Sequence, residues 1–409
     1  MSEAARQIAR AIAEARPRVI AALAAHLRDI DAAEDAFAEA AASCLDLPDP
    51  PDNLPAWLLT VAKRKAVDAI RRREADARAV DGVALLASET AGMADIISLP
   101  EPIPDERLRL IFICCHPALA LEARAALAMK VICGLPVSAI ARVFVTSEQA
   151  MFQRITRAKT KIRDARIDFG LPPRKAWGER LGAVVLTLEL AYTVAYQDAA
   201  GEVDPELSGE VARLAQMVAE LLSGEPEALG LAALITLARS REAARVDASG
   251  AMVPLSKQDT QTWDFAAIEQ ARLWLDEAAI HERPGPYQTM ALIQLTHARR
   301  AFDGQTDWGA IVKLYDALMA LRPGPMVALN RALALARVDG PERGLEELAM
   351  LPVERLDSAR PFHSAHAELL AQTGARKAAI AALDAALALA PSRAERLFLE
   401  RKRRALAAH

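Results

Sequence analysis

Apolar residues recur every three or four positions along almost the whole chain, and this spacing constrains the fold more than any other feature. It places the apolar side chains on one side of an α-helix. Alternating runs of Val, Ile and Thr, which would indicate β-strands, are nearly absent, and aromatic residues make up only 4%. The sequence therefore predicts an all-α fold.

The chain has 409 residues, which is too long for one compact core, so we expect about three domains. Two breaks separate them: residues 75–104, which mix Gly, Ser and Asp and contain EPIP near their end, and the GLPPR sequence at 170–174. The expected segments are a first domain over 1–75, a linker over 76–104, a second domain over 105–170, a connecting helical domain over 175–280 and helical repeats over 285–409.

Several functional classes are excluded by what the sequence lacks. No apolar run reaches the roughly 18 residues that a membrane span needs, and the densest one, Leu181 to Ala195, contains Glu189. Glu3 and Glu14 argue against an N-terminal export signal, so we expect a cytoplasmic protein with no membrane partner. No GxSxG, GxxxxGK[ST], GxGxxG or HExxH motif is present. We therefore expect neither an enzyme nor a cofactor.

The cysteines do not indicate a metal site. Cys44, Cys114, Cys115 and Cys133 form no CxxC pairs, so we expect reduced thiols packed inside helices. The CCHP sequence at 114–117 resembles a ligand cluster, but two adjacent residues on a helix point about 100° apart. We expect packing there and no bound metal.

The formal net charge is only −4, but the basic residues are clustered in the first 170 residues. One cluster follows a proline-rich loop, in the helix expected from NLPAWLLTVAKRKAVDAIRRR at 53–73. A cationic helix beside a loop suits a melted DNA strand, although basic helix ends are often only solvated. An earlier helix or helix pair, Arg18 to Ala42, has an acidic face that suits either solvent or a protein partner.

The second basic cluster lies in a predicted helix-turn-helix. VSAIARVF is followed by a short turn and by EQAMFQRITRAKTKIR, with Thr146 or Ser147 as the N-cap. Met151, Ile155 and Ala158 are spaced as the inner face of the second helix. The other side is available to a DNA groove, although an ordinary helical hairpin with a basic surface is the alternative.

The order of these segments resembles regions 2 and 4 of extracytoplasmic-function sigma factors, within the sigma-70 family, over roughly residues 5–170. RLRLIFICCHPALALEARAALAMKVICGL, followed by a long helical part, resembles the subgroup with a tetratricopeptide-like C-terminal extension. The resemblance implies core RNA polymerase as a partner, through its β′ clamp helices and β flap. It also implies double-stranded and melted promoter DNA.

The resemblance also implies roles for individual residues. Those expected to bind the β′ clamp helices are Asp31, Glu34, Asp35 and Glu39. Those expected at or beside the −10 element are Asn53, Trp57, Lys63, Arg64, Asp68, Arg71 and Arg72. Those expected at the −35 element, which the helix-turn-helix would read, are Ser147, Glu148, Gln149, Phe152, Gln153, Arg154, Arg157, Lys159 and Lys161.

In the C-terminal part, helix pairs recur about every 30 to 40 residues and end at Pro323, Pro352 and Pro391. This period resembles tetratricopeptide repeats, which stack into a curved solenoid. The DGPERG sequence contains Asp339, Gly340, Pro341 and Gly344. A purely structural role can explain it, with a glycine that ends one helix and a proline in the first turn of the next. It also resembles a motif linked to sigma activity in the subgroup.

The sequence therefore predicts a sigma factor whose extension modulates its activity and contacts its own sigma regions. The competing hypothesis is a DNA-binding regulator or repeat scaffold that never joins core polymerase. Stable binding to core polymerase distinguishes the two.

Overall fold

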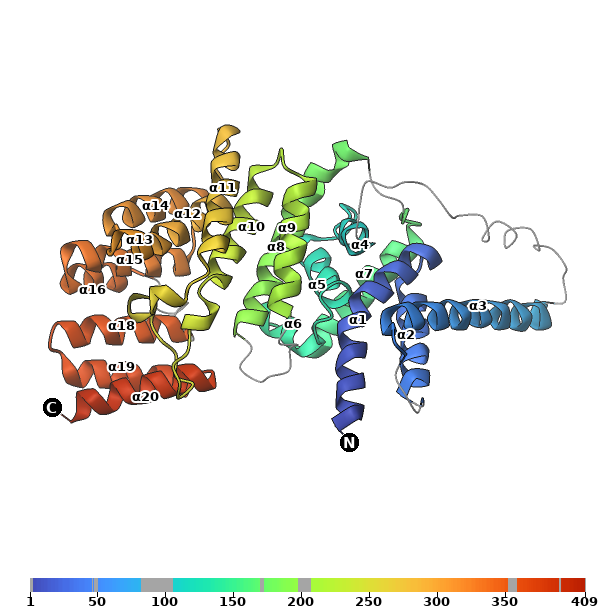
Figure 1. The fold of residues 1–409 in the computed structure, drawn as a ribbon, viewed down its shortest axis with the longest axis horizontal. Coiled ribbons are helices and arrows are strands. Elements are labelled where there is room, and N and C mark those ends of the chain that lie inside the picture. The colour runs from blue at the N-terminus through green and yellow to red at the C-terminus, as the bar shows by residue number, and fades with distance from the viewer. Residues whose placement is uncertain are drawn as a thin grey trace. The chain divides into compact units, whose positions relative to one another are not determined.

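The computed structural model describes residues 3–45, 47, 51–81, 106–169, 173–197, 207–351, 359–389 and 391–408. These residues form helices and connections, with one isolated antiparallel bridge between Val246 and Met252, so the predicted all-α fold is confirmed. The chain divides into two compact units, Met1–Ala191 and Tyr192–His409 (Figure 1). Most of the expected linker, 82–104, lies outside the described residues, as do 48–50 in the proline-rich loop and 170–172 in the GLPPR break.

Three helices at the start of the first unit pack against one another: α1 (Glu3–Leu27), α2 (Ile30–Leu45) and α3 (Leu54–Asp81). The helix pair expected over Arg18 to Ala42 is therefore α1 and α2. α2 buries Ala33, Phe37 and Ala40, which recur at helical spacing, and none of its acidic residues is buried. The amphipathic pattern thus fixes which side of α2 remains accessible.

The rest of the first unit is formed by α4 (Glu106–Cys114), α5 (Leu121–Val131), α6 (Val137–Val143), α7 (Glu148–Asp164) and the first part of α8 (Trp177–Gln197). The second half of α4 is apolar and buries Leu110, Ile111, Phe112 and Ile113. The Phe112 ring stacks on Trp177 with centroids 5.5 Å apart. α1 also contacts α4 and α5, so the first unit is held together by contacts between its two helical groups.

The second unit begins with α9 (Leu207–Leu221), α10 (Pro226–Arg239), α11 (Phe265–Ile280) and α12 (Pro286–Ala298), joined between α10 and α11 by short 3-10 helices. It continues with α13 (Arg300–Asp303), α14 (Trp308–Leu321), α15 (Pro325–Asp339), α16 (Pro341–Ala349), α18 (Arg360–Gln372), α19 (Arg376–Ala388) and α20 (Arg393–Ala407). From α14 onward each labelled helix contacts the next (Figure 1). This arrangement is a helical extension, as the sequence predicts.

The DGPERG sequence forms the sharp connection between α15 and α16. Gly340 has a φ of +100°, which disfavours any residue with a Cβ, and Pro341 occupies the first turn of α16. Gly344 lies where α16 crosses its neighbours: a Cβ there would be 2.6 Å from the Cβ of Ala336 and 2.8 Å from Leu369 Cδ1. The two glycines therefore have structural reasons to be glycine.

Among the described residues, no helix is long and apolar enough to cross a membrane.

Candidate nucleic-acid interface

The turn between α6 and α7 has a strained, well-defined backbone. Val145 has a φ of +49°, which is unusual for a β-branched residue, and its side chain is 92% exposed. The Thr146 amide donates to the carbonyl of Ala141 at 3.0 Å, which closes the turn. Ser147 Oγ then accepts a hydrogen bond from the Ala150 amide at 3.2 Å. Of the two candidates for the N-cap of α7, Ser147 is the one that caps it.

The second helix of this helix-turn-helix, α7, has two distinct sides. The predicted inner face is buried, and Ile162 extends it by one turn beyond Met151, Ile155 and Ala158. Phe152, which was expected to meet DNA, is 61% exposed. The other exposed side chains expected to meet DNA are Glu148, Gln149, Gln153, Arg157 and Lys161.

Arg154 is held in place more firmly than its neighbours. Its guanidinium forms an ion pair with Glu122 at 2.9 Å and lies 5.8 Å from the centroid of the Phe144 ring. Arg154, Arg157 and Lys161 together line a groove between α5 and α7 of about 270 Å³. Three cationic side chains on one accessible groove form a surface suited to phosphate groups.

The basic helix α3 starts at a side-chain cap. Asn53 Oδ1 accepts a hydrogen bond from the Ala56 amide at 3.2 Å, and Trp57 is half-buried in the first turn. Leu58 and Ala62 are buried against α1 and α2. The charged residues of α3 that were expected near the −10 element are all exposed: Lys63, Arg64, Asp68, Arg71 and Arg72.

The acidic side of α2 is split into an accessible half and an occupied half. Asp35 and Glu39 are exposed. Asp31 and Glu34 instead bind Lys159 of α7, at 2.9 Å and 2.5 Å from its Nζ. Arg16 of α1 also pairs with Glu34, at 2.9 Å.

The cluster around Lys159 is partly removed from water. The Lys159 side chain is 12% exposed and that of Glu34 is 19% exposed. Burial opposes the charged form, but hydrogen bonds to Glu34 and Asp31 raise the pKa of Lys159 overall. In this structure, two residues expected to bind polymerase are therefore joined to one expected to bind DNA. Sequence analysis missed this cluster, including Arg16.

The CCHP sequence packs into the core instead of presenting ligands. Cys114 and Cys115 are fully buried free thiols, and burial raises the pKa of Cys115 to about 12. His116 Nδ1 accepts a hydrogen bond from the Ala118 amide at 3.1 Å. Within the described part of the chain, no three His, Cys, Asp or Glu residues are grouped so that they could hold a metal ion.

Three segments of the chain match known protein families. Residues 11–75 match sigma-70 region 2, and residues 109–162 match sigma-70 region 4. Residues 180–279 match a family of unknown function, DUF6596. The two sigma matches cover most of α1, α2, most of α3 and nearly all of the helix-turn-helix, which carry the surfaces described above.

One relative matches almost the whole length. An uncharacterized protein of Rhizobium meliloti (strain 1021) is 39% identical over 396 residues, which cover 95% of this chain and 93% of the relative. The chain belongs to one family with that protein. No solved structure matches the chain.

Regions 2 and 4 are the parts of a sigma factor that bind core RNA polymerase and promoter DNA, and here both lie in one compact unit. The chain is thus a member of the sigma-70 family of RNA polymerase sigma factors, with a helical extension that includes a DUF6596 segment.

Proposed function

We propose that the chain is a sigma factor of the extracytoplasmic-function type, with a tetratricopeptide-like extension that modulates its activity. In this proposal region 2 spans 1–75 and region 4 spans 105–170, as the sequence suggests. The C-terminal part then consists of a connecting domain over 175–280 and repeats over 285–409.

The observation that carries the proposal is the pairing of two exposed surfaces in one unit. One is the stripe of α7 that contains Gln149, Phe152 and Arg157, presented by a capped helix after a fixed turn. The other is the basic α3, with Lys63 and Arg64 exposed. A regulator that only recognises a duplex needs the first surface but not the second.

The proposed division of labour follows from the charges. Asp35 and Glu39 on α2 would dock on the cationic side of the β′ clamp helices, and region 4 would contact the β flap. α7 would insert into the duplex major groove at the −35 element, with Arg154, Arg157 and Lys161 on phosphates. α3 would hold the opened −10 strand, with its cations along the backbone and Trp57 near an unstacked base.

For the extension, we propose a modulating contact with the sigma regions of the same chain. A covalently attached segment has a high effective concentration at its own front half, so it can replace a separate regulator. The DGPERG connection between α15 and α16 is the proposed element of that control. Its rigid geometry suits a surface that must keep its shape.

The decisive experiment for this proposal is binding to core polymerase. The purified full chain is mixed with core enzyme and passed over a size-exclusion column at moderate salt. Co-elution at one chain per core enzyme, lost in the presence of an excess of another sigma factor, supports the proposal. Separate elution, together with retained binding to DNA, would identify a regulator or scaffold that does not join polymerase.

A further inference from the structure

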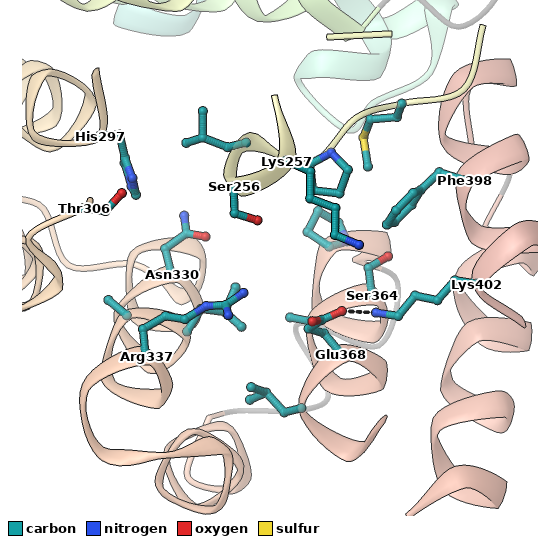
Figure 2. Close-up of a pocket in the computed structure, with 18 of the residues that line it drawn as sticks. Ser256, Lys257, His297, Thr306, Asn330, Arg337, Ser364, Glu368, Phe398 and Lys402 are labelled. Atoms are coloured by element: carbon teal, nitrogen blue, oxygen red, sulfur yellow. Dashed lines mark hydrogen bonds and ion pairs between the residues drawn. The ribbon is translucent and has the colours of Figure 1, made fainter. Parts of the chain in front are cut away.

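A large cavity lies entirely within the Tyr192–His409 unit (Figure 2). Its volume is about 850 Å³, which falls in the range that small-molecule sites occupy. It is lined by residues from the loop around the 3-10 helix η4 (Leu255–Lys257) and from α12, α13, α14, α15, α18 and α20. Neither sigma region contributes to it.

The lining is built from regular helical stripes. α15 contributes Asn330, Ala334 and Arg337, which are spaced by three or four residues and so lie on one side of the helix. α18 and α20 do the same, with Ser364 and Glu368 from the first and Phe398 and Lys402 from the second. The cavity is therefore a surface that three helices present together, not a packing defect between two of them.

The charge of the lining is strongly positive. Six cationic side chains face two carboxylates, namely Lys257, Arg300, Arg337, Arg360, Arg401 and Lys402 against Glu368 and Glu395. Three of the cations have carboxylate partners: Arg360 with Glu395 at 3.0 Å, Lys402 with Glu368, and Arg401 with Asp247 at 2.7 Å. Among the residues that the structure describes, Lys257, Arg300 and Arg337 form no ion pair within hydrogen-bonding distance of a carboxylate, although Arg337 lies near enough to Glu368 to interact with it electrostatically. The surplus favours an anion.

Arg300 positions the cation that lies next to it in the cavity. Its guanidinium donates to the carbonyl oxygen of Ser256 at 2.6 Å and to that of Gln258 at 2.9 Å. These carbonyls flank Lys257, so the backbone of η4 is tied to α13 on both sides of it. Figure 2 shows Lys257 extending into the cavity from this side.

Arg337 is the second available cation. Its guanidinium lies 5.7 Å from the centroid of the Trp308 ring, which restricts its orientation and leaves its N–H donors unpaired with carboxylates. Figure 2 shows Arg337 and Asn330 reaching into the cavity from α15, opposite Ser364. Two cations with neutral donors between them can hold an anionic group.

The remaining walls suit an apolar body. Trp308, Tyr315 and Phe398 present aromatic surface to the cavity. His297 packs edge-on against Trp308, with centroids 5.3 Å apart. Burial and the nearby Arg241 and Arg300 lower the pKa of His297 to about 4, so its imidazole is neutral at pH 7 and adds no charge to this wall.

We propose that this cavity binds a small organic anion, whose carboxylate or phosphate group is held by Lys257 and Arg337 and whose apolar body packs on Trp308 and Phe398. The ligand bridges η4, α15 and α20, which are distant in sequence. Its binding therefore stabilises the second unit by mass action.

The test uses the full chain and three probes: phenyl phosphate, benzoate and neutral benzyl alcohol. Isothermal titration and tryptophan fluorescence measure binding. We expect saturable binding of at least one anionic probe, at least tenfold tighter than that of benzyl alcohol. The chain with Lys257→Gln and Arg337→Gln should bind that probe at least tenfold more weakly. Both residues are exposed, and circular dichroism will verify that the variant is folded.

The matched control is Lys313→Gln, which removes one exposed cation of α14 that does not line the cavity. The affinity of this variant for the anionic probe should stay within twofold of that of the unaltered chain. Inorganic phosphate, added as a competitor, tells whether the anionic group alone is enough for binding. The proposal is overturned by either of two results: no saturable binding of either anion at millimolar concentration, or equal binding of the anion by the double variant and the unaltered chain.

Discussion

Lys159 of α7 and Glu34 of α2 form a partly buried ion pair, with 2.5 Å between Nζ and Oε2. The pair joins region 4 to region 2, and Asp31 makes a second contact with the same ammonium group at 2.9 Å. A sigma factor that docks through α2 must expose this acidic side to polymerase. In the structure, Asp31 and Glu34 on that side are already paired with Lys159 of the same chain.

The first prediction concerns that competition. Lys159→Gln removes the ammonium group that Asp31 and Glu34 share, while Glu34 keeps its pair with Arg16, so affinity for core polymerase should rise about fivefold, as expected for the loss of one ion pair of about 1 kcal/mol. The measurement is competition for core enzyme followed by fluorescence anisotropy. Lys161→Gln, an exposed neighbour on α7, is the control and should leave affinity for core unchanged. Unchanged or weaker binding by Lys159→Gln would show that the pair does not compete with docking.

The second prediction concerns the accessible half of α2. Asp35→Arg and Glu39→Arg should each weaken core binding about tenfold, because each replaces attraction to a cationic surface by repulsion. Both residues are exposed, so the chain should fold normally. Glu277→Arg, an exposed charge reversal on α11, is the control. If all three variants bind core equally, α2 is not the docking helix.

The third prediction concerns phosphate contacts. Arg157→Gln should weaken promoter binding and reduce the slope of log affinity against log salt by about 1, because one phosphate contact is lost. Arg154→Gln should do the same and also lose the pair with Glu122. Arg213→Gln, on α9 in the second unit, is the control. The measurement is a filter-binding titration at several salt concentrations. An unaltered slope would show that a surface other than this side of α7 contacts the promoter phosphates.

The fourth prediction concerns the DGPERG connection. Gly344→Ala should destabilise the protein by about 1–3 kcal/mol, because its Cβ would collide with Ala336 and Leu369. Gly182→Ala, in α8, meets nothing within 4 Å and should instead stabilise by about 0.5–1 kcal/mol. Urea unfolding of the full chain followed by circular dichroism compares them. Equal midpoints for the two variants would refute the close contact.

The fifth prediction concerns pH. Burial lowers the pKa of His297 from its usual 6.5 to about 4 in the folded chain. Between these two pH values His297 is therefore mostly protonated in the unfolded chain and mostly neutral in the folded chain. The stability that depends on neutral His297 is present above pH 6.5 and is lost as the pH falls towards 4. Between pH 7 and 5 the unaltered chain should lose about 2 kcal/mol more than His297→Gln. If urea unfolding shows that the unaltered chain and His297→Gln lose the same free energy of unfolding between pH 7 and 5, the lowered pKa of His297 is contradicted.

Much of the fold follows from local sequence patterns. Helical spacing predicts the buried stripe of α7 through Met151 and Ile155, and turn chemistry predicts a cap at Thr146 or Ser147, of which the structure uses Ser147. Both features depend on neighbours within a few residues. The stop at Gly340 and the start of α16 at Pro341 are predictable for the same reason.

The long-range contacts could not be predicted in this way. Lys159 and Asp31 are separated by 128 positions, and each is an ordinary charged residue on a helical surface until α2 and α7 pack together. The need for Gly344 to be small depends on Leu369, which belongs to another helix. Likewise Lys257 and Arg337 converge on one cavity only because stacked helices bring them together.

The central claim is that this chain directs initiation at a promoter through α2, α3 and α7. Its most direct test is run-off transcription by purified core polymerase on the region upstream of the chain's own gene. We expect a discrete transcript with the full chain, a several-fold smaller yield with Arg157→Gln or Asp35→Arg, and an unchanged yield with Glu277→Arg. No transcript above that of core enzyme alone, on this and other candidate templates, would contradict the claim.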